Sequence, residues 1–259
     1  MSVPSLEGRF AIVTGASSPG GIGRAIARRF AREGASVLLV AEGTQAQLDD
    51  AQALCAAEGG SGRIEVLPID LSLPEGPASM IDAAVRLFGR VDILINNAAA
   101  RASVPFGDYT RAQFDHVVAV NLAAPFFASQ AVLPLMRRQG GGRIIHIASQ
   151  LGHVTYPSRA LYGLTKAALW HATKTLAQAL APHIRVNGVG PGPTLASIHQ
   201  DASEFAAEAA HTLLQKPADP QQIAQAVLYL IDASSVTGQM IAVDGGQHLA
   251  WRTPDIIGD

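Results

Sequence analysis

The sequence is poor in cysteine, in lysine and in charge. Among its 259 residues there are one cysteine (Cys55) and three lysines, and charged side chains make up 15% of the chain. A single cysteine excludes a disulfide within the chain, which is typical of proteins from reducing compartments. The formal net charge is −2, and no basic run is longer than two residues. We therefore expect no nucleic-acid-binding surface.

Further absences concern targeting and metals. The N-terminal "MSVPSLEGRF" has no basic start followed by an apolar stretch, so it does not resemble a signal peptide. The longest continuous apolar runs have the length of strands, which predicts no membrane span. The eight histidines include no His-x-His and no pair at i,i+4, so no metal site is expected. Together these absences predict a cytoplasmic protein that binds neither membrane nor metal.

What the chain does contain is a repeated alternation of short apolar runs and helical patterns. Apolar residues make up 48% of the composition, enough for a large core. The runs are continuous in hydrophobicity, as in strands buried on both faces of a parallel sheet. We predict an α/β fold over residues 1–259: a single Rossmann-type domain with a doubly wound parallel sheet of about seven strands and helices on both faces. The predicted strands are Phe10–Val13, Val37–Ala41, Ile64–Ile69, Val91–Ile95, Arg143–Ala148, Ile184–Val189 and Met240–Val243.

A glycine-rich stretch, "TGASSPGGIG" (Thr14–Gly23), joins the first predicted strand to a helix. Glycine allows a sharp turn and a close backbone approach to a ligand, and the free N–H groups of a helix N-terminus bind phosphate. The pattern predicts a dinucleotide-binding loop, with a tight turn that holds no ligand as the alternative. In the helix that follows, residues recur at i+4, which predicts a buried stripe (Ile22, Ile26, Phe30) and a solvated stripe (Arg24, Arg28, Arg32).

In "ALYGLTKAALW", Tyr162 and Lys166 are four residues apart in a helical pattern and would share one face. An ammonium close to a phenol favours the phenolate and lowers the pKa of the tyrosine. The pair therefore predicts a general acid/base that works near neutral pH. A surface tyrosine–lysine pair is the alternative.

Further motifs stand in a consistent order along the chain. "NNAA" (Asn96–Ala99) follows the fourth predicted strand, and Ser149 in "HIASQ" precedes Tyr162 by thirteen residues. "VNLAAPF" contains Asn121, while "VGPGPT" and "VDGG" stand at the last two strands. With the glycine loop and the tyrosine–lysine pair, the chain resembles a short-chain dehydrogenase/reductase over essentially its whole length. It departs from that pattern at Ala99, where the family usually has glycine, and in the extra pair Pro19-Gly20 of the loop.

The resemblance implies a catalytic set of four residues. Tyr162 would exchange a proton with the carbonyl or alcohol oxygen, and Lys166 would lower its pKa and hold the nicotinamide ribose. Ser149 would hydrogen-bond the substrate oxygen, and Asn121 would hold a water that joins Lys166 to solvent. The cofactor site that the resemblance implies consists of Gly15, Ser17, Ser18, Gly21, Ile22, Gly23, Glu42, Asp70, Leu71, Asn97, Ala98, Tyr162, Lys166, Pro191, Gly192 and Thr194.

The choice between NAD and NADP depends on charge near the adenosine ribose. A 2′-phosphate needs cationic partners, whereas a free ribose diol suits a carboxylate. The glycine loop has no basic residue before Gly21, and Glu42 stands where many NADP-dependent members carry arginine. We therefore favour NAD(H), with NADP(H) possible because Ala41 stands where NAD-type members carry aspartate. Asp70 is expected either at the adenine ring or as a turn residue.

The reaction that the resemblance implies is hydride transfer between the cofactor and a secondary alcohol or ketone, such as a sugar, a polyol or a cyclic hydroxy compound. The segments "VTGQMIAVDGGQHLAW" and "PGPTLASIHQ" also resemble a pteridine-reductase-like branch, which makes an NADPH-dependent pterin reductase the alternative. Ser149, which stands where that branch has aspartate, and a glycine loop without arginine argue against it. A non-catalytic nucleotide-binding regulator is the remote alternative.

Candidate substrate contacts lie beside the catalytic set. They include an irregular stretch, Gly190–Gln200, and a predicted substrate loop around residues 193–216 that overlaps it. His146 lies on a predicted strand and is expected in the core. Family members are commonly homo-oligomers, which implies a tetramer or dimer here. The candidate substrate residues are Arg101, His153, Tyr156 and His199, and the candidate subunit contacts are Phe126, Phe127, Trp170 and Leu176.

Overall fold

The structure is a computed structural model that describes residues 5–102, 104–152, 154–155, 159–195 and 201–250. Seven parallel strands form one sheet in the order β3-β2-β1-β4-β5-β6-β7. This is the doubly wound α/β fold that the alternating pattern predicts. The strands are β1 (Phe10–Thr14), β2 (Ser36–Ala41), β3 (Ile64–Pro68), β4 (Ile93–Asn96), β5 (Gly142–Ile147), β6 (Ile184–Pro191) and β7 (Met240–Val243).

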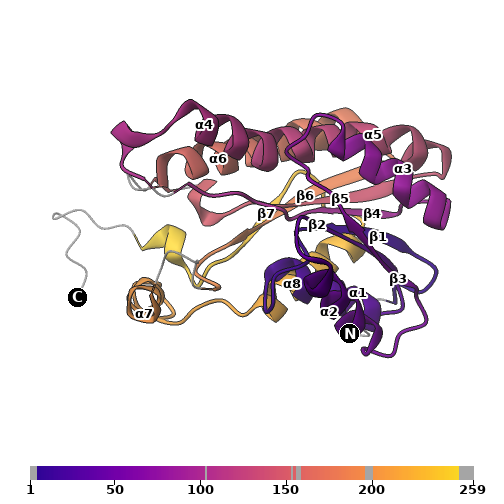
Figure 1. Ribbon diagram of the computed structural model, residues 1–259, viewed down its shortest axis with the longest axis horizontal. Helices are drawn as coiled ribbons and strands as arrows, with labels where there is room; N and C mark the ends of the chain where they lie inside the picture. The colour runs from indigo at the N-terminus through magenta and orange to yellow at the C-terminus, as the bar shows by residue number, and fades with distance from the viewer. Residues whose placement is uncertain (1–4, 103, 153, 156–158, 196–200, 251–259) are drawn as a thin grey trace.

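Helices cover both faces of the sheet. In Figure 1, α3 to α6 lie above it, and α1, α2 and α8 lie below it. Crossovers through helices are what parallel strands require. The helices are α1 (Ile22–Arg32), α2 (Gln45–Ala56), α3 (Gly76–Phe88), α4 (Arg111–Val118), α5 (Ala124–Arg138), α6 (Ala160–Leu180), α7 (Ala202–Ala210) and α8 (Pro220–Asp232).

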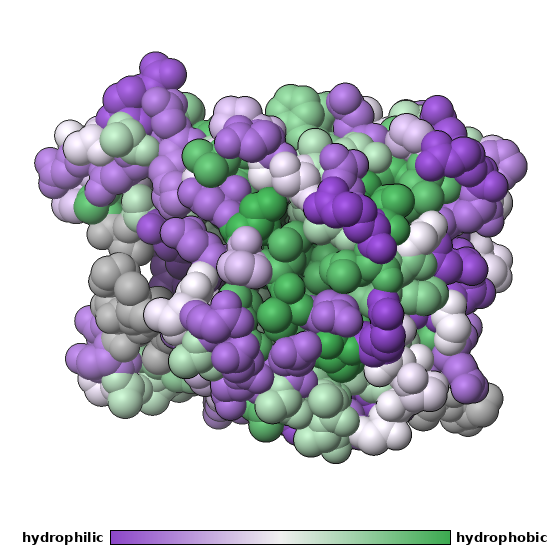
Figure 2. Space-filling model, turned by 45° about the vertical axis from the view of Figure 1, so that its right-hand side comes forward, coloured by the Kyte–Doolittle hydropathy of each residue, from purple (hydrophilic) through white to green (hydrophobic). Residues whose placement is uncertain are grey.

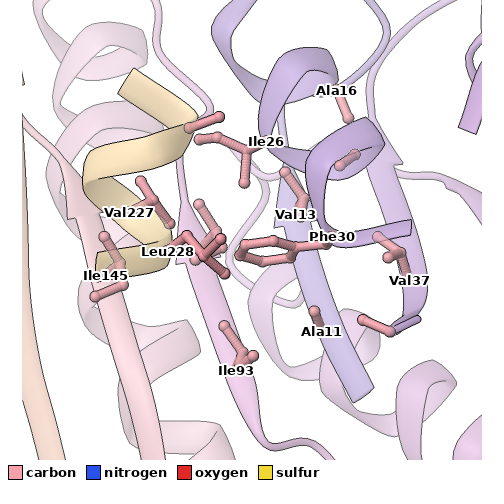
Figure 3. Close-up of a cluster of buried hydrophobic side chains, with 14 of the residues drawn as sticks. Ala11, Val13, Ala16, Ile26, Phe30, Val37, Ile93, Ile145, Val227 and Leu228 are labelled. Carbon is pink, nitrogen blue, oxygen red and sulfur yellow. The ribbon is translucent and has the colours of Figure 1, made fainter. Parts of the chain in front are cut away.

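Each side of the sheet has its own hydrophobic core. In the lower core, Phe30 and Ile26 of α1 project between β1 and α8, where they meet Val13 and Val227 (Figure 3). Phe30 is fully buried, and burial of such a side chain contributes about 1.5–3 kcal/mol. The apolar i+4 stripe predicted for this helix is therefore confirmed. The upper core lies beneath α3, α5 and α6 and includes Met80, Val132 and Leu180.

The strand prediction is wrong at one functionally relevant boundary. Gly190 and Pro191 continue β6, whereas the sequence placed both in an irregular stretch. Their backbones pair with Ala242 and Val243 of β7, so the sheet extends further toward the predicted cofactor site. The predicted substrate loop also contains a helix, α7, capped by the Asp201 side chain, which accepts hydrogen bonds from the N–H groups of Ser203 and Glu204.

One helical stretch is longer than the sequence analysis expected. α4, a π-helical segment (Ala119–Ala123) and α5 together span Arg111–Arg138, 28 residues that could cross a membrane by length and composition alone. This helical stretch includes charged residues, so it is not one of the continuous apolar runs from which the sequence analysis expected no membrane span. A core helix passes the same test, and in this fold Ala128, Val132 and Met136 pack in the upper core.

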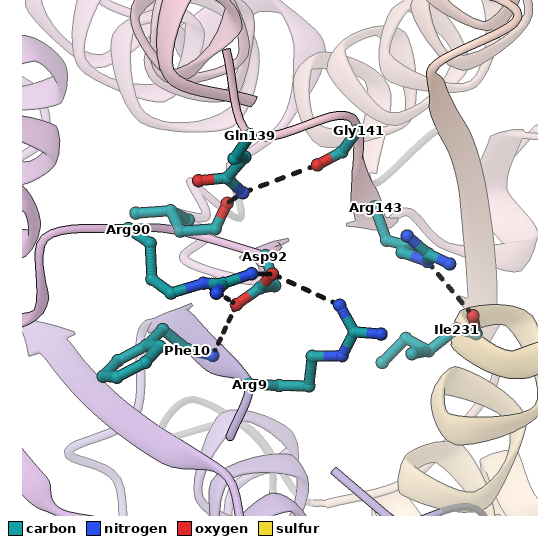
Figure 4. A network of polar contacts seen from close by, with 9 residues as sticks. Arg9, Phe10, Arg90, Asp92, Gln139, Gly141, Arg143 and Ile231 are labelled. Carbon is teal, nitrogen blue, oxygen red and sulfur yellow. Dashed lines mark hydrogen bonds and ion pairs between the residues drawn. The ribbon is translucent and has the colours of Figure 1, made fainter. Parts of the chain in front are cut away.

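At the amino ends of the strands, polar groups are tied to one another. Asp92, just before β4, accepts a hydrogen bond from the Phe10 N–H at 2.9 Å and pairs with Arg90 at 2.6 Å and Arg9 at 3.4 Å (Figure 4). On β6, Arg185 donates to the Leu230 and Ile231 carbonyls at the C-terminus of α8, where cations are favoured. Ion pairs and hydrogen bonds of charged side chains therefore stabilise this end of the sheet.

The carboxyl ends of the strands lie at the opposite edge. The chain order reverses between β1 and β4, and at such a switch point the two crossovers leave in opposite directions and open a crevice. The glycine loop follows β1, "NNAA" follows β4 and Ser149 follows β5. In Figure 2 the surface is hollowed at the left, between the upper and lower helix layers. The fold therefore gathers the predicted site residues at one edge.

Candidate active site

The glycine loop is shaped by close packing against the segment after β4. Gly15 has φ +68°, and a Cβ there would lie 2.8 Å from the Ala98 Cα. A Cβ on Gly23 would lie 2.5 Å from both the Asn97 Nδ2 and the Gly15 carbonyl oxygen. These two positions therefore require glycine for packing as well as for the turn. Gly21 is the N-cap of α1.

The N-terminus of α1 fits a phosphate group. Gly21 supplies no side-chain cap, and the first turn contains no acidic residue. The first N–H groups of a helix have no partner within the helix, and they carry a partial positive charge. These free donors and the small residues in front of them match what the pyrophosphate of a nicotinamide dinucleotide requires.

Thr14 and Asn97 hold this loop in place. The Thr14 Oγ1 accepts hydrogen bonds from the N–H groups of Asn97 and Ala98, both at 2.9 Å. The Asn97 side chain in turn donates to the carbonyls of Thr14, at 2.7 Å, and Gly15, at 3.1 Å. Sequence reasoning did not assign Thr14 a role. Its position could have indicated this role, because it places a hydroxyl at the end of a buried strand next to the glycine turn.

Arg24 corrects one prediction from the sequence. It was placed in a solvated stripe, but it is buried, with 4% of its surface exposed. Its guanidinium pairs with Asp50 at 2.5 Å and donates to the carbonyls of Ser17 and Gln47. The reason is tertiary: α2 brings Asp50 and Gln47 over this face of α1. The charge of Arg24 is thereby neutralised beneath the glycine loop.

The other predicted cofactor residues lie around the same edge. Ser17 donates from its Oγ to the Glu42 carbonyl at 3.5 Å, and the Glu42 side chain is exposed at the end of β2. Asp70 accepts a hydrogen bond from the Ser72 N–H at 2.7 Å, so its carboxylate stabilises the turn after β3. That hydrogen bonding to Ser72 lowers the pKa of Asp70 despite partial burial. Ile22 is half-buried, Ser18 is exposed and Leu71 belongs to the upper core.

The segment after β6 is also fixed by hydrogen bonds and close packing. The Gly192 N–H donates to the Val243 carbonyl at 3.1 Å, and Thr194 donates from its Oγ1 to the Gly192 carbonyl at 3.0 Å. A Cβ on Gly192 would lie 2.6 Å from the Asp244 Cα. Asp244, which sequence reasoning missed, accepts hydrogen bonds from Gly246 and His248 and fixes the chain after β7. Pro191 ends β6 and is buried.

Tyr162 and Lys166 share a buried face of α6, as predicted. The Lys166 Nζ donates to the Ile147 carbonyl at 2.8 Å and lies 5.6 Å from the centre of the Tyr162 ring. Ser149 stands two residues beyond Ile147, is 7% exposed and accepts a hydrogen bond from the Leu151 N–H. The end of β5 and the start of α6 thus bring these three side chains to one place.

The electrostatics of this group favour a reactive phenol. Burial raises the pKa of Tyr162, but the positive charge of Lys166, the charge and hydrogen bonding of Arg101, and the smaller effect of the Arg159 charge together outweigh it. The net pKa of Tyr162 is therefore below its ordinary value. Burial also lowers the pKa of Lys166, with Tyr162 opposing this and Arg101 adding to it. Such matched shifts are characteristic of acid/base pairs.

Asn121 lies in the π-helical segment between α4 and α5 and is 1% exposed. Its Oδ1 accepts from the Ala100 N–H at 2.7 Å, and its Nδ2 donates to the Ala100 carbonyl at 2.9 Å and to Thr165 at 3.0 Å. The side chain therefore fixes the segment that leads to Arg101. π-helical insertions occur frequently at functional sites. The water that the sequence analysis expects at Asn121 stays a prediction.

The candidate substrate residues are only partly described. Arg101 lies with its Cζ 5.0 Å from the centre of the Tyr162 ring, at the mouth of the site. His153, Tyr156 and His199 fall outside the described residues. His146 is fully buried on β5, bonded to Thr173, and burial lowers its pKa to about 3. Its expected place in the core is confirmed.

Comparison with known proteins defines the family. The family model described as "Enoyl-(Acyl carrier protein) reductase" matches residues 15–248. The chain is 33% identical to a 3-oxoacyl-[acyl-carrier-protein] reductase FabG of Thermotoga maritima over 93% of this chain and 98% of that protein. It is 34% identical to a 7alpha-hydroxysteroid dehydrogenase of Escherichia coli, covering 93% of this chain and 94% of that one.

A similar solved structure is FolM Alternative dihydrofolate reductase 1 from Brucella suis in complex with NADP. It has a TM-score of 0.89 and 33% identity, covering 96% of this chain and 99% of that one. The chain belongs to the short-chain dehydrogenase/reductase family. It is an NAD(P)-dependent oxidoreductase, which sets it apart from the regulator considered above.

Proposed function

We propose that the protein transfers a hydride between a nicotinamide cofactor and a secondary alcohol or ketone, with Tyr162 as general acid/base. The observation that carries this proposal is the buried phenol of Tyr162, whose pKa is lowered by the facing Lys166 and Arg101. A general acid/base is most effective when its pKa approaches the working pH. Secondary alcohols and ketones include the sugars, polyols and cyclic hydroxy compounds that the sequence analysis expects as substrates.

The residues then have distinct tasks. Tyr162 removes the hydroxyl proton in the oxidation direction and returns it in reduction. Lys166 stabilises the phenolate and offers its remaining ammonium protons to the cofactor ribose. Ser149 donates to the substrate oxygen, where negative charge develops. Asn121 keeps the backbone at Ala100 fixed and holds the water of the proton relay. When bound, the cofactor supplies or accepts the hydride.

For the cofactor we propose NAD(H). Two features support it: the exposed carboxylate of Glu42 at the end of β2, and the pairing of Arg24 with Asp50 beneath the glycine loop. A 2′-phosphate would meet a negative charge there without a free cation from the loop. NADP(H) is the second candidate, because the Brucella suis structure contains NADP. Titration of the purified protein with NADH and NADPH decides this, and tighter NADPH binding overturns the proposal.

A pterin reductase is the second candidate function. The resemblance to the Brucella suis dihydrofolate reductase favours it, whereas Ser149 in place of aspartate argues against it. One assay panel separates the two. NAD-linked oxidation is measured with secondary alcohols, including sugars, polyols and cyclic alcohols, and NADPH-linked reduction is measured with a dihydropterin. Turnover of the dihydropterin alone would make the pterin reductase the correct function.

We further propose that the protein acts in the cytoplasm as a homo-oligomer, a tetramer or dimer. Phe126 and Phe127 of α5 support the oligomer, because they are 44% and 50% exposed and contact each other edge to face. Exposed aromatic pairs are typical of subunit interfaces. Light scattering coupled to gel filtration measures the mass, and the double change of both phenylalanines to serine should reduce it. A monomeric wild type contradicts the proposal.

A further inference from the structure

Arg101 is a cation at the mouth of the active site that has no carboxylate partner among the residues the structure describes. Its guanidinium carbon lies 5.0 Å from the centre of the Tyr162 ring, its side chain hydrogen-bonds to the phenol, and the residue is exposed. Among the described residues, no carboxylate lies within ion-pair distance of it. Arg159 makes the contrast clear, because both of its terminal nitrogens pair with Glu208 of α7 at 3.1 Å.

Arg101 is held in this place by buried structure. Asn121 grips both the N–H and the carbonyl of the preceding residue, Ala100. On the following side, Tyr109 donates from its hydroxyl to the Ala102 carbonyl at 3.3 Å. The backbone is therefore fixed at both neighbours of Arg101. A surface arginine that served only solubility would not need such support.

A guanidinium presents a planar set of donors that matches a carboxylate. We propose that the substrate is a short hydroxy acid, or the corresponding oxo acid, whose carboxylate binds Arg101 while its hydroxyl or carbonyl oxygen faces Tyr162. The inference rests on the proposed function. The carboxylate takes no part in the bonds that change, so Arg101 determines specificity.

The geometry limits the length of this acid. The guanidinium lies over the ring whose edge carries the reacting hydroxyl, so both contacts must be made by one small molecule. With hydrogen bonds of about 2.7–2.9 Å at each end, the carboxylate and the reacting carbon must lie close together in the molecule, as in an α- or β-hydroxy acid. Long acyl chains with a distant acid group do not satisfy both contacts.

The test compares each acid with its neutral amide: lactate with lactamide, and β-hydroxybutyrate with β-hydroxybutyramide. In the wild type, kcat/KM should be about 10- to 100-fold higher for the matching acid, as expected for a charge-assisted hydrogen bond in place of a neutral one. This preference should disappear in Arg101→Gln and survive in part in Arg101→Lys. Arg111→Gln, at an exposed arginine of α4, is the matched control and should keep it.

A second readout needs no turnover. Because the charge of Arg101 lowers the pKa of Tyr162, neutralising that charge with a bound acid should raise it. Ultraviolet titration of tyrosinate should therefore shift to higher pH when butyrate, an unreactive acid, is added to the wild type. The shift should be absent in Arg101→Gln, and its loss in Tyr162→Phe identifies Tyr162 among the four tyrosines of the chain as the titrating group.

The outcomes distinguish a failure of the hydroxy-acid inference from a failure of the proposed oxidoreductase function. Equal turnover of acids and amides by the wild type, or an acid preference that survives in Arg101→Gln, overturns the inference and leaves the oxidoreductase assignment of Tyr162 intact. If neutral secondary alcohols and hydroxy acids are all inert with both cofactors, the proposed function fails as well. Unchanged thermal melting of Arg101→Gln verifies that the variant is folded.

Discussion

The two ends of the parallel sheet use the same kinds of side chain for different purposes. At the amino end, Arg9 and Arg90 share Asp92, and Arg185 is bound to the carbonyls that end α8. At the carboxyl end, Lys166 binds a backbone carbonyl of β5, and Arg101 lies over an aromatic face. At the first end the charges of Arg9 and Arg90 are paired with Asp92, while at the second the charges of Lys166 and Arg101 lower the pKa of Tyr162.

This difference indicates that the amino end of the sheet contributes to stability and the carboxyl end to catalysis. Buried apolar strands connect the two ends, so a change at one end need not disturb the other (Figure 1). Changes at the carboxyl end should alter rate with little loss of stability, and changes at the amino end should do the reverse. The predictions below test this comparison.

The largest effect is expected from Tyr162→Phe at the carboxyl end. It removes the proton carrier and keeps the ring, so turnover should fall about 10²- to 10⁴-fold while the cofactor still binds. Steady-state kinetics and cofactor titration measure both quantities. The matched control is Tyr229→Phe, at an exposed tyrosine of α8. Undiminished turnover in Tyr162→Phe would remove this residue from its proposed role.

Lys166→Met should shift the pH dependence of alcohol oxidation. Oxidation requires the phenolate, so the rate rises with pH and levels off above the pKa of Tyr162. Among the charges around the phenol, Lys166 contributes most to lowering that pKa, so its removal should move the rising limb to higher pH. On that limb, the rate at a fixed pH should fall about tenfold for each pH unit by which the limb moves. The profile is measured at saturating cofactor.

The control for this change is Lys174→Met, on the same helix but exposed over Trp170. It should leave the pH profile in place. A limb that stays at the same pH in Lys166→Met would show that the charge of this lysine does not set the pKa of the phenol.

At the amino end, Asp92→Ala should destabilise the fold and leave kcat nearly unchanged. It leaves the Phe10 N–H and two guanidiniums without their acceptor, which should cost about 1.5–3 kcal/mol of unfolding free energy. Urea denaturation measures the loss, with Asp115→Ala as an exposed control that costs about 0.3–0.5 kcal/mol. A large fall in kcat with unchanged stability would contradict the division between the two ends.

The smallest effect is expected from Glu42→Gln. Removing an exposed negative charge near the adenosine ribose should reduce the preference for NADH over NADPH about two- to fivefold. The ratio of the two dissociation constants is the measurement. Glu7→Gln, at an exposed position before β1, is the control. A ratio that does not respond would mean that Glu42 lies too far from the ribose to discriminate.

Much of the fold could be predicted because local pattern and tertiary structure agree. The seven predicted apolar runs correspond to the seven strands, because a strand that is apolar on both faces is stable only where helices cover both faces of the sheet. The Tyr162–Lys166 spacing placed both side chains on one helix face, which is a local property of the helix. β6 was predicted too short, because Gly190 and Pro191 are strand residues only through their pairing with β7.

The sequence by itself determined the layered α/β fold, the glycine turn and the family, because these depend on period, spacing and residue type. Only the tertiary structure decided which charges are neutralised. Arg24 looks solvated along its own helix, yet α2 covers it with Asp50, while Arg101 keeps its charge beside Tyr162. The physical reason is that the strength of a charge depends on burial and on partners from other elements, and no local pattern records either.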